Sequence, residues 1–309
     1  MSDFHPDLAR ARFLPPLSYG PRTAGLLRRL APRPVDPGPG VRVQELVVPG
    51  LDGEPDVGLR VFQPAALAEP APALLWVHGG GFVFGSPEQD DPFNAAFARE
   101  LGITVAAVRY RLGPDHPAPA AVRDTYAGLH ALVQRAQKLH VDVDRLAVGG
   151  ASAGGGIAAG LAQLAHDRGE IRPTFQLLVY PMLDDRTVLR TDQDTRGVRA
   201  WTPKSNRYGW TSYLGRQPGG ADVPPYAAPA RRDDLHGLPP AWIGVGTLDL
   251  FEDEDREYAR RLTEAGVPCE LHVVPGAFHG FDAMFRDAPV SRAFWTEQAA
   301  ALRRALLDR

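Results

Sequence analysis

The sequence predicts an α/β fold in which a mostly parallel sheet is covered by helices on both faces. From about residue 73 onwards, short apolar runs alternate with helix-length segments, as buried parallel strands and their crossover helices do. One apolar run leads into Gly150-Ala151-Ser152-Ala153-Gly154, a G-x-S-x-G motif between a predicted strand and a predicted helix. The motifs His78-Gly79-Gly80-Gly81 and His279-Gly280 also follow predicted strands. The glycine-rich loops therefore belong to the carboxyl ends of strands.

The N-terminal part of the chain differs from the rest. Residues 1–40 are rich in Pro and Arg and contain leucines at helical spacing, so we expect an N-terminal arm with one or two short helices. Residues 41–309 then form the main domain. Within it, the alternating segments 41–48 and 57–62, with turn residues between them, predict a pair of edge strands.

The remaining elements follow in a regular alternation. Strands are predicted at 73–77, 103–108, 146–148, 175–180, 241–245 and 270–274, and helices at 90–101, 118–139, 155–165, 252–265 and 293–307.

The alternation stops between residues 183 and 225. This stretch carries Trp201, Trp210 and Tyr213 among many charged residues, and it is too long and too aromatic for a simple loop. We expect a helical cap over the carboxyl edge of the sheet, joined there by the N-terminal arm.

Composition excludes several classes of protein. The 309 residues are 44% hydrophobic and 23% charged with a net charge of −3, and no basic stripe suggests nucleic acid or an anionic membrane as a partner. The one cysteine, Cys269, excludes an internal disulfide and a cysteine metal site, and we expect it to be a buried thiol. With no signal-peptide pattern and no apolar stretch of membrane-spanning length, we expect a soluble, cytoplasmic protein.

Ser152 is the candidate nucleophile. A serine hydroxyl attacks a carbonyl only when a base removes its proton, and a sharp strand-to-helix turn points that hydroxyl out of the sheet. Gly150 and Gly154 permit such a turn. The alternative is a glycine-rich helix entry without chemistry.

The segment His78-Gly79-Gly80-Gly81 is the candidate oxyanion loop. A tetrahedral oxyanion needs amide donors that are in place before the charge develops, and glycines let the backbone approach it. We assign this role to the N–H groups of Gly80, Gly81 and Ala153, and we expect the ring of His78 to anchor the loop. The alternative is a flexible hinge.

Asp249 is the candidate acid, because it directly follows the predicted strand at 241–245 and the turn after it. Its rivals fall in the first turns of the next helix, where the helix dipole already accounts for acidic residues. They are Glu252, Asp253, Glu254 and Asp255.

His279 is the candidate base. Of the nine histidines, it is the one in a loop downstream of the acid, after the last predicted strand, and Gly280 gives it room. A structural histidine is the alternative. The order nucleophile, acid, base agrees with the chain order of an α/β-hydrolase.

Four motifs together extend this interpretation. They are His78-Gly79-Gly80-Gly81-Phe82, the segment YRLGPDHP at 110–117 with Pro119-Ala120-Ala121 after it, Gly150-Ala151-Ser152-Ala153-Gly154, and Phe278-His279-Gly280-Phe281. Over about residues 40–309 the chain resembles the hormone-sensitive-lipase family of esterases (bacterial family IV). The second motif, similar to the family's YRLAPEHPFPAA, is highly specific. The resemblance implies an α/β-hydrolase fold with a cap formed by the N-terminal arm and by residues 183–225.

Two positions depart from the family pattern. Ala151 precedes the nucleophile where the family usually has Asp or Thr. The family's DPLRDE motif reads DLFEDE at 249–254, with matches at its first, fifth and sixth positions. This match supports Asp249 and suggests that Asp253 stands behind it as a supporting residue.

The resemblance implies hydrolysis of short- to medium-chain esters through an acyl-serine, with no metal ion or cofactor. The activity is expected to rise as His279 loses its proton between about pH 5 and pH 8. An apolar substrate entrance is expected, although core packing explains aromatic residues equally well. Its candidate residues are Phe82, Phe84, Trp201, Trp210, Tyr213 and Leu250.

Two other functions use the same fold. An amidase or deacetylase would differ only in its leaving group, and a small-molecule receptor would have lost the histidine, which is present here. The resemblance also implies a homodimer formed through the strand edge at 269–274 and the helix at 293–307.

Overall fold

The fold is built around one eight-stranded sheet. The computed structural model describes residues 4–30, 32–67 and 69–308, and its strand order is β1-β2-β4-β3-β5-β6-β7-β8. The strands are β1 (Val41–Val48), β2 (Val57–Pro64), β3 (Ala71–Val77), β4 (Thr104–Arg109), β5 (Val141–Ala151), β6 (Phe175–Val179), β7 (Ala241–Gly246) and β8 (Cys269–Val274).

The sheet is mostly parallel, as predicted. Strand β2 pairs antiparallel with both β1 and β4, and every pairing from β4 to β8 is parallel. The prediction of a pair of edge strands is therefore right for β1 and wrong for β2, which lies between two neighbours. An alternating pattern identifies a half-buried strand but carries no information about which strands pair with it.

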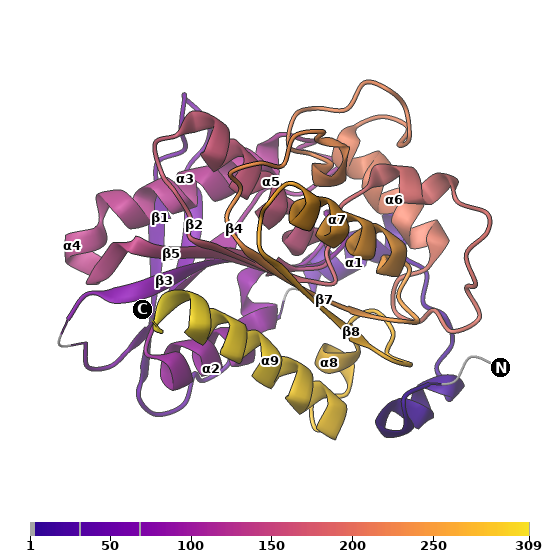
Figure 1. Cartoon of the computed structure of the whole chain (residues 1–309), viewed down its shortest axis with the longest axis horizontal. Helices are drawn as coiled ribbons and strands as arrows, with labels where there is room; N and C mark the ends of the chain where they lie inside the picture. Colours follow the sequence, from indigo (N-terminus) through magenta and orange to yellow (C-terminus); the bar gives the residue numbers. More distant parts are fainter. Residues whose placement is uncertain (1–3, 31, 68, 309) are drawn as a thin grey trace.

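Helices cover both faces of the sheet (Figure 1). Helices α3 (Ala120–Gln134), α5 (Ala153–Arg168) and α7 (Glu252–Glu264) lie on one face, and α2 (Asp91–Leu101) and α9 (Pro289–Leu306) lie on the other. The side chains of each strand alternate between two apolar layers, so that Leu75 packs on the α5 side and Trp76 on the α9 side. The long helix predicted at 118–139 breaks at Arg135, and its end forms the short α4 (Ala136–Leu139).

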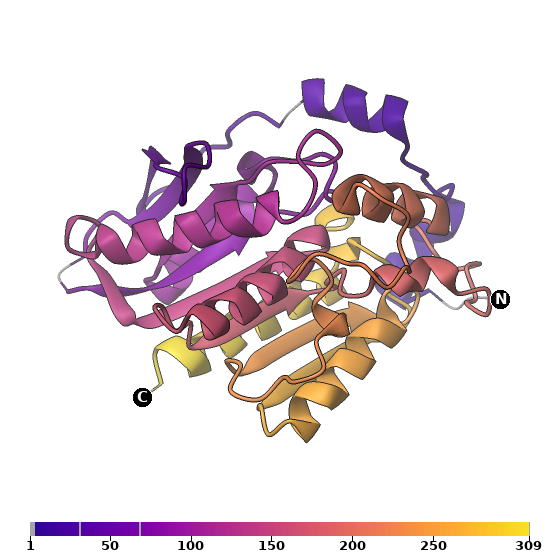
Figure 2. The same ribbon diagram turned by 90° about the horizontal axis from the view of Figure 1, so that it is seen from above.

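The two segments expected to form a cap lie at the carboxyl ends of the strands. Residues 183–225 include the 3₁₀ turn η3 (Asp185–Leu189) and helix α6 (Pro203–Leu214). The N-terminal arm forms η1 (Pro6–Phe13) and α1 (Pro21–Arg29), and α1 lies outside the main layers (Figure 2). Arg28 of α1 donates hydrogen bonds to the carbonyl oxygens of Val83 and Gly113, which ties the arm to the loops after β3 and β4.

The remaining short elements are η2 (Pro87–Asp90) before α2, η4 (Pro229–Arg231) before β7, and α8 (Phe281–Met284) before α9. Within the described parts of the chain, no helix combines the length and the apolar character needed to cross a bilayer.

Candidate active site

Ser152 stands at a sharp turn between β5 and α5. Its backbone has φ +58° and ψ −122°, a strained conformation for a residue with a side chain, and the side chain is 7% exposed. The turn brings strand and helix so close that a Cβ on Gly154 would lie 2.0 Å from the carbonyl oxygen of Val77. Only glycine fits at that position, which explains the second glycine of the G-x-S-x-G motif.

His279 joins Ser152 to Asp249. Its Nε2 lies 2.8 Å from Ser152 Oγ, and its Nδ1 lies 2.8 Å from Asp249 Oδ2. These distances suit a hydroxyl that donates to Nε2 and an Nδ1–H that donates to the carboxylate. The three side chains come from loops after β5, β7 and β8, and they meet because the carboxyl ends of neighbouring parallel strands share one edge of the sheet.

Asp249 is fixed from both sides. Its Oδ1 accepts a hydrogen bond of 3.0 Å from the backbone N–H of Phe251, while its Oδ2 faces His279. The side chain has no exposed surface, so water screens its interaction with the imidazole only weakly.

The structure does not bring Asp253 to this group. Its side chain is 56% exposed and forms an ion pair with Arg190. Asp253 lies in the first turn of α7, on the side that faces solvent, because the same turn directs Glu254 and Asp255 inwards. The suggestion that Asp253 supports Asp249 is therefore wrong.

The glycine loop after β3 lies beside Ser152. A Cβ on Gly79 would lie 3.4 Å from Ser152 Cβ. Among the described residues, the N–H groups of Gly80 and Gly81 have no hydrogen-bond acceptor, and Ala153 is the first residue of α5, where an N–H has no partner within the helix. The three amides predicted to bind an oxyanion are thus free to do so.

His78 anchors this loop. Its ring is 1% exposed, its Nδ1 lies 2.8 Å from the carbonyl oxygen of Gly79, and it stacks on the ring of Tyr110 at 4.3 Å. The hydroxyl of Tyr110 in turn donates to the carbonyl oxygen of His78. Burial lowers the pKa of His78 to about 4, so the ring is neutral at pH 7 and serves as a structural part rather than as an acid or base.

This depressed pKa predicts a loss of stability in acid. A histidine that titrates near 6.5 when unfolded and near 4 when folded adds stability above pH 6.5 and loses it as the pH falls to 4. The loss is about 3 kcal/mol. The free energy of unfolding, measured by urea titration across this range, should fall less steeply in His78→Asn than in the parent protein.

His236→Asn is the matched control, because the His236 side chain is exposed. Its free energy of unfolding should fall between pH 6.5 and pH 4 as steeply as that of the parent protein. If the free energy of unfolding fell equally steeply with pH in His78→Asn and in the parent protein, the assignment of a neutral, buried His78 would be contradicted.

Three of the aromatic residues expected at the substrate entrance belong to the core. Phe82, Trp210 and Tyr213 are at most 1% exposed, and the rings of Phe82 and Tyr213 stack at 4.0 Å. Side chains without solvent contact cannot line an open entrance, so that expectation is wrong for these three. Their contacts join the loop after β3 to α6, which is a packing role.

Trp201 and Phe84 lie closer to the glycine loop. A Cβ on Gly81 would lie 1.8 Å from the ring of Trp201, so the ring rests directly on the candidate oxyanion loop. Phe84 is half-buried and packs against Tyr19 of the N-terminal arm at 5.2 Å. Leu250 is buried, but with Asp249 it lines a small cavity of about 170 Å³.

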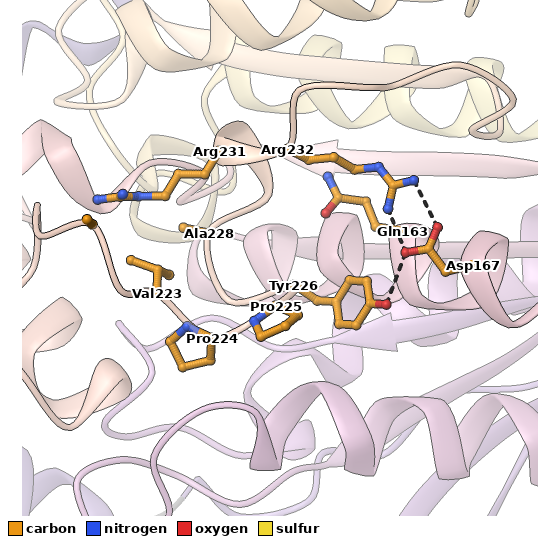
Figure 3. A pocket seen from close by; sticks show the side chains of 10 residues that line it. Gln163, Asp167, Val223, Pro224, Pro225, Tyr226, Ala228, Arg231 and Arg232 are labelled. Atoms are coloured by element: carbon orange, nitrogen blue, oxygen red, sulfur yellow. Dashed lines mark hydrogen bonds and ion pairs between the residues drawn. The ribbon is translucent and has the colours of Figure 1, made fainter.

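A larger cavity lies towards the end of α5 that is remote from Ser152. Figure 3 shows the side chains that line it. The cavity measures about 420 Å³ and is walled by Gln163, by the segment around Tyr226 and by two arginines. Arg232 and the hydroxyl of Tyr226 both bind the carboxylate of Asp167, which holds this wall closed on α5. None of the three residues of the Ser152–His279–Asp249 group lines it.

Sequence reasoning missed two rings that contact His279. Tyr180 follows β6 and Phe251 follows Asp249, and their centroids lie 4.8 Å and 5.2 Å from that of the imidazole. An aromatic residue at the end of a parallel strand was the available signal for Tyr180. No sequence signal distinguishes Phe251 from the other buried aromatic residues.

The group of side chains can perform nucleophilic acyl chemistry, because a hydroxyl, a base and an orienting acid lie in hydrogen-bonded order beside free amide donors. Across the residues that the structure describes, no cluster of three or more His, Cys, Asp or Glu side chains could hold a metal ion.

Comparisons with known proteins show the family of this chain. A family model described as alpha/beta hydrolase fold matches residues 74–283. The carboxylesterase NlhH of Mycobacterium tuberculosis is 36% identical over 274 residues, which cover 87% of this chain and 84% of the relative. An ethyl acetate hydrolase of Pseudomonas putida is 34% identical, with 78% and 76% covered.

Solved structures show the same likeness. A structure described as a bacterial heroin esterase superposes with a TM-score of 0.89 at 41% identity, and the match covers 98% of both chains. The chain therefore belongs to the α/β-hydrolase family, within its hormone-sensitive-lipase branch of carboxylic ester hydrolases.

Proposed function

We propose that this carboxylesterase hydrolyses short- to medium-chain esters through an acyl-serine intermediate, with Ser152 as nucleophile, His279 as base and Asp249 as orienting acid. The observation that carries the proposal is the imidazole with a hydrogen-bond partner on each nitrogen, at 2.8 Å to Ser152 and 2.8 Å to Asp249. A base within that distance of a serine hydroxyl can remove its proton as the oxygen attacks.

Acylation of the enzyme is the first half of the reaction. The proton of Ser152 Oγ passes to His279 Nε2 while Oγ bonds to the ester carbonyl carbon. The carbonyl oxygen becomes an oxyanion that accepts hydrogen bonds from the N–H groups of Gly80, Gly81 and Ala153. The imidazolium then gives its proton to the departing alkoxide, and the alcohol leaves.

Deacylation repeats these steps with water. His279 takes a proton from water as the oxygen attacks the acyl-serine, and then returns a proton to Ser152 Oγ as the carboxylic acid departs. Asp249 keeps the Nδ1–H tautomer throughout and stabilises the imidazolium. No step of this cycle calls for a metal ion or an organic cofactor.

The choice of acyl chain is assigned to the cap formed by residues 1–40 and 183–225. Support comes from Trp201, which rests on Gly81, and from the hydrogen bond between Arg28 of the arm and Val83 in the loop after β3. These contacts support a cap whose two segments lie near the amides proposed to bind the oxyanion. The relative named ethyl acetate hydrolase supports short acyl groups.

A series of p-nitrophenyl esters from acetate to decanoate tests the proposal, run with and without a serine-directed phosphonate. Hydrolysis should be fastest at the short or medium chain lengths, and the phosphonate should abolish it by labelling Ser152. The p-nitroanilide of the best acid separates an amidase from an esterase. Preference for the anilide would favour the amidase, and an unlabelled Ser152 would contradict the acyl-serine mechanism.

A homodimer through β8 and α9 is also proposed. Strand β8 is one of the two edge strands of the sheet, and its residues up to Val273 are half-buried or exposed. Sedimentation equilibrium measures the association directly, and a monomer at every concentration tested would contradict it.

A further inference from the structure

Two aromatic rings hold the imidazole of His279 from its sides. The ring of Tyr180 meets it at 64° and the ring of Phe251 at 83°, so both pack nearly perpendicular to it. The two ring nitrogens are already bound to Ser152 and Asp249. The remaining freedom of the imidazole, its tilt about the line between those partners, is limited by these two rings.

Tyr180 is itself fixed by a buried carboxylate. Its hydroxyl donates a hydrogen bond of 2.9 Å to Oδ1 of Asp282, and the two residues are 6% and 5% exposed. Asp282 lies three residues after His279, at the start of α8. The turn that carries His279 therefore also carries Asp282, whose carboxylate orients the ring of Tyr180 beside the imidazole.

The backbone of Tyr180 is strained. Its φ is +36°, in a region that a bulky side chain rarely adopts. Such a conformation persists only where the surrounding structure enforces it. Here the N–H of Tyr180 donates to the carbonyl oxygen of Gly244 at 2.7 Å, and its hydroxyl is bound to Asp282. Ser152 is strained in the same way, and both residues contact His279.

The charge of Asp282 also acts on His279. Burial is the largest influence on its carboxyl and raises its pKa, while the hydroxyl of Tyr180 and the charge of His279 favour the ionised form. A carboxylate in a site of low exposure favours a positive imidazole nearby. The other titratable or charged groups that face this region are Asp90 from η2, Glu100 from α2, Arg286 after α8 and Arg292 from α9.

We propose that Tyr180 and Asp282 are positioning residues for the ester hydrolysis. Asp282 orients Tyr180 against the imidazole, and its negative charge stabilises the imidazolium that forms when Ser152 gives up its proton. This inference rests on the proposed acyl-serine mechanism and adds a second carboxylate to it, one that acts through a tyrosine and through space.

Asp282→Asn tests the charge. The amide oxygen can still accept from Tyr180, so the substitution removes the charge with little change of shape. We expect kcat/KM to fall about tenfold, as for the loss of one partly screened charge interaction. We also expect the acidic limb of the pH profile of kcat/KM to move to lower pH, because the imidazolium of the free enzyme becomes less stable.

Tyr180→Phe tests the orientation. The ring remains but loses its bond to Asp282, so kcat should fall about tenfold while KM stays within about twofold. This variant also carries the test if Asp282→Asn does not fold. An unchanged kcat in Tyr180→Phe would overturn the positioning role.

Two matched control variants distinguish the loss of a positioning residue from the general effect of removing a buried polar group. Tyr258→Phe removes another fully buried hydroxyl, which is bonded to Gln163 at 3.3 Å. Asp185→Asn removes another fully buried carboxylate, which is paired with Arg231. Both controls should keep the acidic limb of the parent enzyme even where the melting temperature falls.

Asp90 needs a separate arm of the experiment, because burial raises its pKa to about 6, within the window of the acidic limb. Asp282→Asn should shift the acidic limb of the kcat/KM profile by the same amount in the parent enzyme and in an Asp90→Asn variant. A shift that vanishes in this background would assign the effect to Asp90 and overturn the inference.

Active-site titration distinguishes a failure of the acyl-serine mechanism from a failure of the positioning role of Asp282. Asp282→Asn and the parent enzyme should both bind one phosphonate per chain. Full labelling with coincident acidic limbs would overturn the role of Asp282 and leave the acyl-serine mechanism in place. An unlabelled parent enzyme would overturn the mechanism and this inference with it.

Discussion

Ser152→Ala should reduce kcat for p-nitrophenyl esters by about 10⁴-fold or more, as the loss of a nucleophile does in enzymes of this chemistry. The variant keeps His279, Asp249 and the amides of the glycine loop, but no oxygen remains to form the acyl-enzyme. The substitution removes a single hydroxyl, which is hydrogen-bonded to His279, so the melting temperature should stay close to that of the parent. Stopped-flow kinetics and thermal melting measure the two effects.

Ser291→Ala is the matched control for this variant. Ser291 is also buried, its hydroxyl has no hydrogen-bond partner among the described residues, and it lies in α9 rather than beside His279. Its kcat should equal that of the parent enzyme. A burst of p-nitrophenol from Ser152→Ala, equal to one acyl group per chain, would show that another residue is the nucleophile.

Asp249→Asn should lower kcat by about 10⁴-fold, although it changes only an oxygen to an NH₂ group. The N–H of Phe251 binds Oδ1, so the amide of the variant keeps its oxygen there and turns its NH₂ towards His279. Nδ1 must then accept a hydrogen bond, which moves the ring proton to Nε2. In that tautomer His279 cannot take the proton of Ser152. Steady-state kinetics at pH 8 measure the loss.

Asp253→Asn is the natural comparison, because Asp253 lies four residues away and has an exposed side chain paired with Arg190. It should change kcat by less than about twofold, as surface substitutions away from a site do. Equal losses in Asp249→Asn and Asp253→Asn would contradict the assignment of Asp249 as the orienting acid.

The sequence was most informative where a backbone conformation demands a particular residue. Gly154 leaves room for the carbonyl oxygen of Val77, and Gly81 leaves room for the ring of Trp201. Such close approaches exclude a Cβ, so the structural requirement is visible as glycine spacing. Strand and helix positions were predictable for the same reason, because burial on one or two faces leaves a periodic apolar pattern.

The sequence was least informative about which face a side chain occupies. The acidic run at 252–255 looks uniform, yet Asp253 is exposed and Asp255 is fully buried with neither carboxyl oxygen hydrogen-bonded among the described residues. Burial raises the pKa of Asp255 well above its usual range. The aromatic residues were equally ambiguous, since Trp210 packs in the core and Phe84 lies half-buried beside the N-terminal arm.

The amino-acid sequence alone determined the α/β fold, the chain order of Ser152, Asp249 and His279 at the ends of strands, and the glycine loop after β3, because each depends on local conformation and short-range spacing. Only the tertiary structure decided what surrounds the imidazole. Tyr180 and Asp282 are 102 positions apart and meet behind His279 because β6 and the turn after β8 end at the same edge of the sheet. Contacts of that kind depend on the packing of whole elements, and no pattern within a single segment records them.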